Sequence, residues 1–233
     1  MQSSIVSRNY VFKAMNKSPI KIFKKTRTIE EFNRLYIKIL QSCQSQNNRT
    51  IMVASCNKGE GSSTIAVNLS RIIAKKNNGK ILLIDANWRN SIIERVFNID
   101  RIPGLADIIS KNVELDVSIK KTEIENLEIL TAGSAVSDPV SVLNSEKVTN
   151  CLEKLKKDYS VIILDSPPVI PFSDSLYLSS VVDMFLLVIE AEKTRWEVAQ
   201  EAIQKISAAK VKTFGTILNK KKDHIPTMVY KKI

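Results

Sequence analysis

The chain has 233 residues, of which 44% are hydrophobic and 25% are charged, and it carries a net charge of +11. This composition is typical of a soluble globular protein with one domain. Neither an apolar run of transmembrane length nor a signal-peptide pattern occurs, so we expect a cytosolic protein. The three cysteines are scattered and odd in number, which argues against a disulfide framework and a cysteine-based metal site.

Basic residues gather at both ends of the chain, and strands and helices alternate between them. We expect residues 1–27 to form a basic tail or linker, residues 28–219 one domain, and residues 220–233 a short basic tail. The first helix of the domain is predicted from Thr28 to Cys43. The predicted strands are Ile51–Ser55, Ile81–Ile84, Leu127–Thr131, Val161–Leu164, Met184–Ile189 and Thr213–Leu218. The predicted helices between them are Ser62–Lys76, Asn90–Phe97, Leu105–Ile109, Val142–Lys156, Asp174–Ser180 and Thr194–Ala209.

These strands are continuously apolar and rich in β-branched residues, which is typical of a sheet covered on both faces. Strands that alternate with helices favour parallel pairing with right-handed crossovers. The sequence therefore predicts an α/β fold with a mostly parallel, twisted sheet and helices on both faces. In such a fold, ligands gather at the edge where the carboxyl ends of the strands meet.

A glycine-rich loop, Asn57-Lys58-Gly59-Glu60-Gly61-Ser62-Ser63-Thr64, joins the first predicted strand to the helix that follows it. Glycines let backbone N–H groups approach an anion closely, and the helix N-terminus adds further donors and a partial positive charge. Residues Lys58 to Thr64 are therefore predicted to bind a nucleotide phosphate, with a hydroxyl of Ser63 or Thr64 directed at Mg²⁺. The usual motif ends in Gly-Lys-Ser/Thr, and Ser62 stands where the lysine belongs, so phosphate transfer is in question.

Two aspartates end predicted apolar strands, Asp85 after Ile81–Ile84 and Asp165 after Val161–Leu164. Such acids commonly hold Mg²⁺ beside a bound triphosphate, although either one alone is also typical of a helix cap. Together with the glycine-rich loop, they predict a metal site formed by Ser63, Asp85 and Asp165. Asn219 ends the last strand, and its amide is either a purine contact or a turn residue.

Five runs of residues together resemble a known family. From about Thr28 to Asn219, the chain is similar to the cytoplasmic domain of the bacterial tyrosine kinases that regulate capsule and exopolysaccharide synthesis. These kinases are related to the septum-site and plasmid-partition ATPases. The runs that carry the resemblance are Gly59-Glu60-Gly61-x-Ser63-Thr64, Leu82-Leu83-Ile84-Asp85-Ala86, Pro103-Gly104-Leu105, Thr131-Ala132-Gly133 and Ile163-Leu164-Asp165-Ser166-Pro167-Pro168.

The resemblance implies a P-loop NTPase fold that binds ATP or ADP with Mg²⁺ at the glycine-rich loop. It implies that Asp85 coordinates the metal and helps to deprotonate the attacking tyrosine, that Asp165 assists the metal, and that Asn219 lies near the adenine. It further implies a transmembrane polysaccharide co-polymerase as activating partner, and hence a cytoplasmic protein at the inner face of the cell membrane.

Further partners are expected from the charge and from the family. The basic ends favour an anionic membrane surface, and the family suggests a homo-oligomer. Nucleic acid is not expected, because aromatic residues are not interleaved with the terminal lysines.

Four departures from the family pattern bear on activity. Ser62 replaces the loop lysine, and Asn87 stands where the family has a second aspartate. The Glu-x-x-Arg-x-x-Arg helix used for ring assembly reads Glu30-x-x-Asn33-x-x-Tyr36 here, and the shifted register Glu31-x-x-Arg34-x-x-Ile37 recovers only one arginine. The C-terminal tyrosine cluster, the autophosphorylation target, is reduced to Tyr230.

The sequence therefore predicts a nucleotide-binding, tyrosine-kinase-like protein of exopolysaccharide synthesis or export, with weak or lost kinase activity and a regulatory role. One alternative is an active autophosphorylating kinase in which Lys58 is the catalytic lysine that serves the phosphates. The other is a partition-type ATPase that binds DNA or a membrane through its basic surface.

Overall fold

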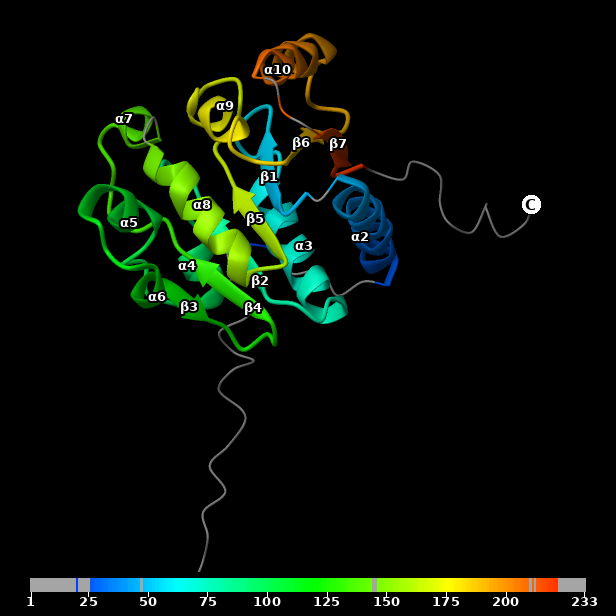
Figure 1. Ribbon diagram of the computed structural model, residues 1–233. Helices are drawn as coiled ribbons and strands as arrows, with labels where there is room; N and C mark the ends of the chain where they lie inside the picture. Colours follow the sequence, from blue (N-terminus) through cyan, green and yellow to red (C-terminus); the bar gives the residue numbers. More distant parts are fainter. Residues whose placement is uncertain are drawn as a thin grey trace, which may run out of the picture.

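The computed structural model describes residue 20 and residues 26–46, 48–143, 146–209, 211 and 213–221. At its centre lies a seven-stranded sheet in the order β3-β4-β2-β5-β1-β6-β7 (Figure 1). Every neighbouring pair is parallel except β3 with β4. The strands are β1 (Thr50–Ser55), β2 (Ile81–Asp85), β3 (Ile119–Lys121), β4 (Leu127–Leu130), β5 (Val161–Asp165), β6 (Met184–Glu190) and β7 (Thr213–Asn219).

Helices within the described ranges cover both faces of this sheet (Figure 1). Their apolar side chains recur every three or four residues, as in α8, where Val148, Cys151, Leu152 and Leu155 are buried. The helices are α2 (Thr26–Gln46), α3 (Ser62–Lys76), α4 (Ile93–Phe97), α5 (Leu105–Lys111), α6 (Leu115–Ser118), α7 (Pro139–Leu143), α8 (Glu146–Asp158), α9 (Asp174–Ser179) and α10 (Trp196–Ala208).

Alternate residues of the central strands enter two separate hydrophobic cores. Met52 and Ala54 of β1 pack with residues of α5, α8, α9 and α10, whereas Ile51 and Val53 pack with residues of α2, α3 and α4. Because successive side chains of a strand point to opposite faces, a strand between two helical layers must be apolar throughout. The predicted α/β fold, with a mostly parallel sheet between two layers of helices, is confirmed.

Several element boundaries differ from the prediction. The short strand β3 and the helix α6 were not expected, because Ile119-Lys120-Lys121 is a brief, half-polar run with no strand-like pattern. The predicted helix Val142–Lys156 consists of two helices, and the first begins with Pro139, a residue favoured at the first helical position. The helix α4 begins at Ile93 instead of Asn90.

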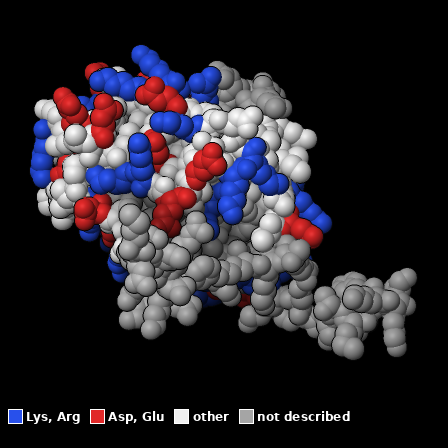
Figure 2. All heavy atoms as spheres, turned by 90° about the horizontal axis from the view of Figure 1, so that it is seen from below, with Lys and Arg blue, Asp and Glu red and all other residues white. Residues whose placement is uncertain are grey.

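The surface in the view of Figure 2 carries basic and acidic side chains side by side. No large field of one sign stands out on this face among the described residues. Most of the two predicted basic tails lies outside the described residues, as does Tyr230. Among the helices of the described ranges, none has the length and apolar composition that crossing a bilayer requires.

Candidate functional site

The glycine-rich loop lies at the carboxyl edge of the sheet, between the end of β1 and the start of α3. Gly61 is the N-cap of α3 and has φ 101°, a left-handed conformation that favours glycine. A Cβ atom at Gly61 would lie 2.5 Å from the Nδ2 atom of Asn219, so space as well as conformation requires glycine here. Gly59 also has a positive φ, of 85°, but nothing lies within 4 Å of a Cβ at that position.

The backbone N–H groups of the loop have no acceptor among the described protein groups. In the described part of the chain, none of those from Lys58 to Thr64 donates a hydrogen bond to a protein group. Those at the start of α3 belong to its first turn, where no carbonyl precedes them at helical spacing. A row of free N–H groups at a helix N-terminus is suited to binding an anion.

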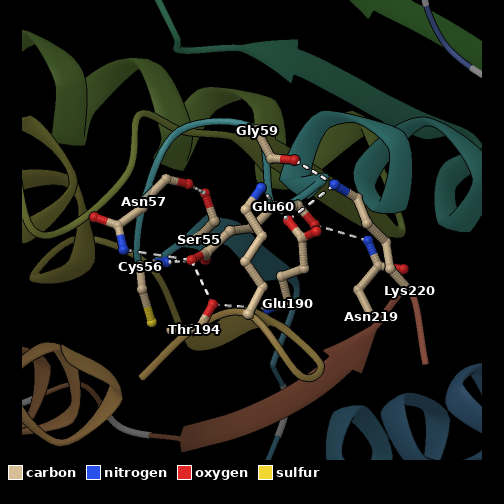
Figure 3. A network of polar contacts seen from close by, with 10 residues as sticks. Ser55, Cys56, Asn57, Gly59, Glu60, Glu190, Thr194, Asn219 and Lys220 are labelled. Atoms are coloured by element: carbon tan, nitrogen blue, oxygen red, sulfur yellow. Dashed lines mark hydrogen bonds and ion pairs between the residues drawn. The ribbon is translucent and has the colours of Figure 1, made fainter. Parts of the chain in front are cut away.

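Glu60 is an acid inside this loop, yet its carboxylate is occupied within the protein (Figure 3). The side chain is buried; Oε2 accepts a hydrogen bond from the Cys56 N–H at 2.9 Å and Oε1 accepts one from the Thr194 hydroxyl at 2.7 Å. The Glu60 carbonyl accepts a hydrogen bond from the Asn219 amide at 2.8 Å. Glu60 therefore links the loop to the end of β1 and to the turn after β6. Asn219, expected near a purine, uses its amide on the loop itself.

Two lysines lie at or beside the loop, and the role of Lys58 in binding phosphates stays a prediction. Ser62 is buried, and Lys58 is exposed with no hydrogen bond or ion pair to any described residue. The ammonium that contacts the loop belongs to Lys220, which donates to the Gly59 carbonyl at 2.6 Å and to Glu190 at 2.9 Å. Sequence reasoning missed Lys220, although its place directly after a strand end was a usable signal.

The two predicted metal-binding aspartates face each other in register, Asp85 on β2 and Asp165 on β5, and both are fully buried. Asp85 Oδ1 accepts from the Asn87 N–H at 3.0 Å, and Oδ2 accepts from the Ser91 hydroxyl at 3.1 Å and the Ile93 N–H at 3.3 Å. Asp85 thus also caps α4, which explains the late start of that helix. Neither oxygen of Asp165 accepts a hydrogen bond from a described residue.

Burial and mutual repulsion disfavour the charged forms of this acid pair. Burial raises the pKa of Asp85 to about 6, although the N–H groups of Asn87 and Ile93 offset part of the rise. Burial and then the charge of Asp85 raise the pKa of Asp165 well above its ordinary value, and the nearby Ser63 hydroxyl offsets this only in part. A cation between these groups would relieve the repulsion.

The donor set fits Mg²⁺. Its preferred ligands are carboxylate, hydroxyl and water oxygens, and Mg²⁺ sites beside phosphates use only one or two protein carboxylates. Asp165 offers two buried oxygens without a partner, and Ser63 lies beside it. Among the described residues, no cluster of three or more His, Cys, Asp or Glu side chains forms a metal cage.

An ion pair between an exposed arginine and a buried aspartate joins the two loops that follow these strands. Arg89, after β2, donates Nε and Nη2 hydrogen bonds of 2.7 and 3.0 Å to the two carboxylate oxygens of Asp174, which is fully buried. The guanidinium also lies over the ring of Phe172, 4.3 Å from its centroid. Asn87 bonds locally, its Oδ1 accepting from the Asn90 N–H at 3.2 Å. The predicted helix that starts at Asp174 is confirmed as α9 (Asp174–Ser179).

The residues at the lost ring-assembly positions lie on α2. Tyr36 is buried in the hydrophobic core beneath that helix, with 8% of its surface exposed. The Oδ1 atom of Asn33 is buried and has no partner among the described groups. The second of the two positions is therefore committed to packing within the chain.

Comparison with known proteins identifies the family. The sequence matches the family described as AAA domain over residues 48–221. It is 30% identical over 200 residues to the tyrosine-protein kinase CpsD of Streptococcus pneumoniae serotype 4, which covers 84% of this chain and 88% of CpsD. The chain belongs to the bacterial tyrosine kinases of this AAA-domain family.

Solved structures agree with this assignment. The kinase domain of VpsO has 32% identity and a TM-score of 0.73, and the match covers 84% of this chain and 98% of that domain. The septum site-determining protein MinD of Pyrococcus horikoshii, solved in complex with Mg-ADP, has 22% identity and a TM-score of 0.63, over 79% of this chain and 76% of MinD. At that identity MinD supports the fold alone.

Proposed function

We propose that the chain is a nucleotide-binding, tyrosine-kinase-like protein of exopolysaccharide synthesis or export, with weak or lost kinase activity and a regulatory role. The observation that carries this proposal is the row of backbone N–H groups from Lys58 to Thr64 that have no protein acceptor. They lie at the N-terminus of α3, so they offer donors and a partial positive charge to a phosphate. ATP or ADP is the expected ligand.

Mg²⁺ is the proposed second ligand. Ser63, Asp85 and Asp165 are the residues that would hold it, directly or through water, and the unpaired oxygens of Asp165 are the main support. The bound metal would neutralise charge on the phosphates. The chain's own contribution is to keep these acids buried and fixed in register across β2 and β5.

Weak or lost chemistry follows from which groups are missing. One charge-assisted hydrogen bond contributes about 1.5–3 kcal/mol to binding, so loop N–H groups and Mg²⁺ can retain a nucleotide without the lysine that Ser62 replaces. Removing a group aimed at transition-state charge typically costs about 10²–10³ in rate. Asn87 adds to this loss, because an amide cannot take up the proton that a second carboxylate could accept.

The expected partner is a transmembrane co-polymerase at the inner face of the cell membrane, with an anionic membrane surface as a second contact. Family membership supports this part of the proposal. Assembly into rings through α2 is expected to be weak, because Tyr36 is buried in the core of the chain.

The test is calorimetric titration of the purified chain with Mg²⁺-ATP and Mg²⁺-ADP, together with a time course of phosphotyrosine formation. We expect binding of both nucleotides, weakened by Asp165→Asn, and little phosphotyrosine. Absence of binding at millimolar nucleotide would contradict the nucleotide site. Strong phosphotyrosine formation that Lys58→Ala abolishes would instead support the active kinase that uses Lys58.

A further inference from the structure

We propose that Lys220 is a positioning residue of the glycine-rich loop, which aims two of the loop's N–H groups at the bound phosphate. This inference rests on the proposed nucleotide site and extends it to a residue of the predicted C-terminal tail. Lys220 directly follows β7, the edge strand of the sheet, and has φ 57°. Its ammonium lies 2.6 Å from the carbonyl oxygen of Gly59.

Lys220 and Asn219 hold two successive peptide groups of the loop. Lys220 donates to the Gly59 carbonyl, and Asn219 donates to the Glu60 carbonyl at 2.8 Å. In a trans peptide the C=O and the following N–H point in opposite directions. Fixing these two carbonyls toward β7 therefore directs the N–H groups of Glu60 and Gly61 away from β7. Neither N–H has an acceptor in the described part of the chain.

The contact belongs to a closed ring of interactions that joins the glycine-rich loop to β6 and β7 (Figure 3). Lys220 pairs with Glu190, the last residue of β6, at 2.9 Å. The Glu190 N–H donates to the Thr194 hydroxyl at 3.2 Å, and that hydroxyl donates to the Glu60 carboxylate at 2.7 Å. Because the ring closes through Glu60 and Gly59, the turn after β6 and the end of β7 together determine the shape of the loop.

The role is positional and not simply electrostatic. Glu190 lies within hydrogen-bond distance of the Lys220 ammonium, so the pair adds little net charge beside the loop. A second cation, Lys193, lies 3.4 Å from the same carboxylate. The two roles therefore make opposite predictions for Glu190→Met, which removes both the charge and the acceptor for Lys220. Removing the acid strengthens phosphate binding if charge matters, and weakens it if the closed ring matters.

Lys221 provides a matched control. It is the next residue, exposed, and makes no hydrogen bond or ion pair with a described residue. Lys220→Met and Lys221→Met remove the same charge, one residue apart. In calorimetric titrations with Mg²⁺-ADP we expect Lys220→Met to weaken affinity about tenfold and Lys221→Met less than about twofold, in line with one charge-assisted hydrogen bond. Lys220→Arg, which keeps a donor, should remain within about threefold of the unmodified protein.

A second measurement needs no nucleotide. The ¹⁵N relaxation of Glu60 and Gly61 should show increased motion in Lys220→Met and no change in Lys221→Met. If the unmodified chain fails to bind Mg²⁺-ADP, the proposed function falls, and the relaxation data still decide the role of Lys220. Equal relaxation in the two lysine variants, or tighter Mg²⁺-ADP binding by Glu190→Met, would overturn the inference.

Discussion

Replacing Asp165 by asparagine should stabilise the nucleotide-free protein while weakening its binding of Mg²⁺-nucleotide. Asp165 is fully buried, faces the carboxylate of Asp85, and has no hydrogen-bond partner among the described residues. An amide at this position removes one of two repelling charges and can donate a hydrogen bond to the Asp85 carboxylate. If Asp165 only stabilised the fold, Asp165→Asn would instead lower the free energy of unfolding.

The magnitude follows from the electrostatics of the pair. Burial and then the charge of Asp85 raise the pKa of Asp165 well above 3.8, and each pKa unit corresponds to about 1.4 kcal/mol against the charged form. An asparagine carries no charge and avoids this penalty, but its buried amide still needs hydrogen-bond partners. We therefore expect Asp165→Asn to raise the free energy of unfolding by about 2 kcal/mol near pH 7.5, which raises Tm by roughly 4–8 °C for a domain of this size.

The effect should depend on pH with a defined sign. An acid whose folded pKa is raised holds more protons in the folded state than in the unfolded state between the two pKa values. Its contribution to stability is therefore present below the unfolded pKa of 3.8 and is lost as pH rises through about 6 for Asp85. Asp165, with its pKa also raised, acts in the same direction. The gain from Asp165→Asn should accordingly be larger at pH 8 than at pH 5.

Thermal and urea unfolding in EDTA, repeated with Mg²⁺-ADP, measures these changes. The control is Asp183→Asn, at a buried acid that accepts hydrogen bonds from the Arg49 and Thr50 N–H groups at 3.0 Å and from the Thr50 hydroxyl at 2.8 Å. These hydrogen bonds lower the pKa of Asp183 to about 2, so its loss should cost about 2 kcal/mol near neutral pH. If Asp165→Asn destabilises the free protein as much as Asp183→Asn does, Asp165 is a structural acid and the reasoning fails.

Three further predictions concern the residues around the loop. Gly61→Ala should lower the free energy of unfolding by about 1–3 kcal/mol and weaken nucleotide binding measured by calorimetry, because φ is 101° and the Asn219 amide lies 2.5 Å from the new Cβ. Gly59→Ala has open space around its new Cβ and should lower both quantities less. Arg89→Met should lower the free energy of unfolding in urea by about 2 kcal/mol, since it leaves the buried Asp174 unpaired while its own side chain is 34% exposed; an unchanged urea midpoint would show that Asp174 needs no partner. Ser62→Lys should tighten ATP binding by roughly 10–100-fold if the loop retains the shape of a phosphate site, and unchanged affinity would indicate that it does not.

Local patterns in the sequence were sufficient to predict the layers of the fold and to place the glycine-rich loop, Asp85 and Asp165 at the carboxyl edge of the sheet. Six apolar runs predicted the six longer strands, and the residues that follow them identified the loop, Asp85 and Asp165. The strand β3 was missed because Ile119-Lys120-Lys121 has only three residues and pairs at the sheet edge. Such a strand is defined by its neighbour β4 and not by its own sequence.

Contacts between strand ends could not be predicted, because they depend on the order of strands in the sheet. Lys220 reaches Gly59, 161 residues earlier, since β7 lies beside β6 and β6 lies beside β1. Thr194 reaches Glu60 across 134 residues for the same reason. Periodicity predicts which residues end a strand, but it carries no information about which strands become neighbours.

The missing loop lysine should affect nucleotide binding and phosphate transfer unequally under the proposed function. Backbone N–H groups contact a phosphate before, during and after transfer, so they supply binding that does not change along the reaction. A lysine on the transferred group and a second acid near the attacking hydroxyl act mainly in the transition state. This chain keeps the first kind of group, with Glu60 and Asn219 bracing the loop, and has Ser62 and Asn87 at the positions of the second kind. A chain that keeps its binding groups and has replaced its transition-state groups is what we expect of a protein that retains nucleotide binding as a signal after phosphate transfer has weakened.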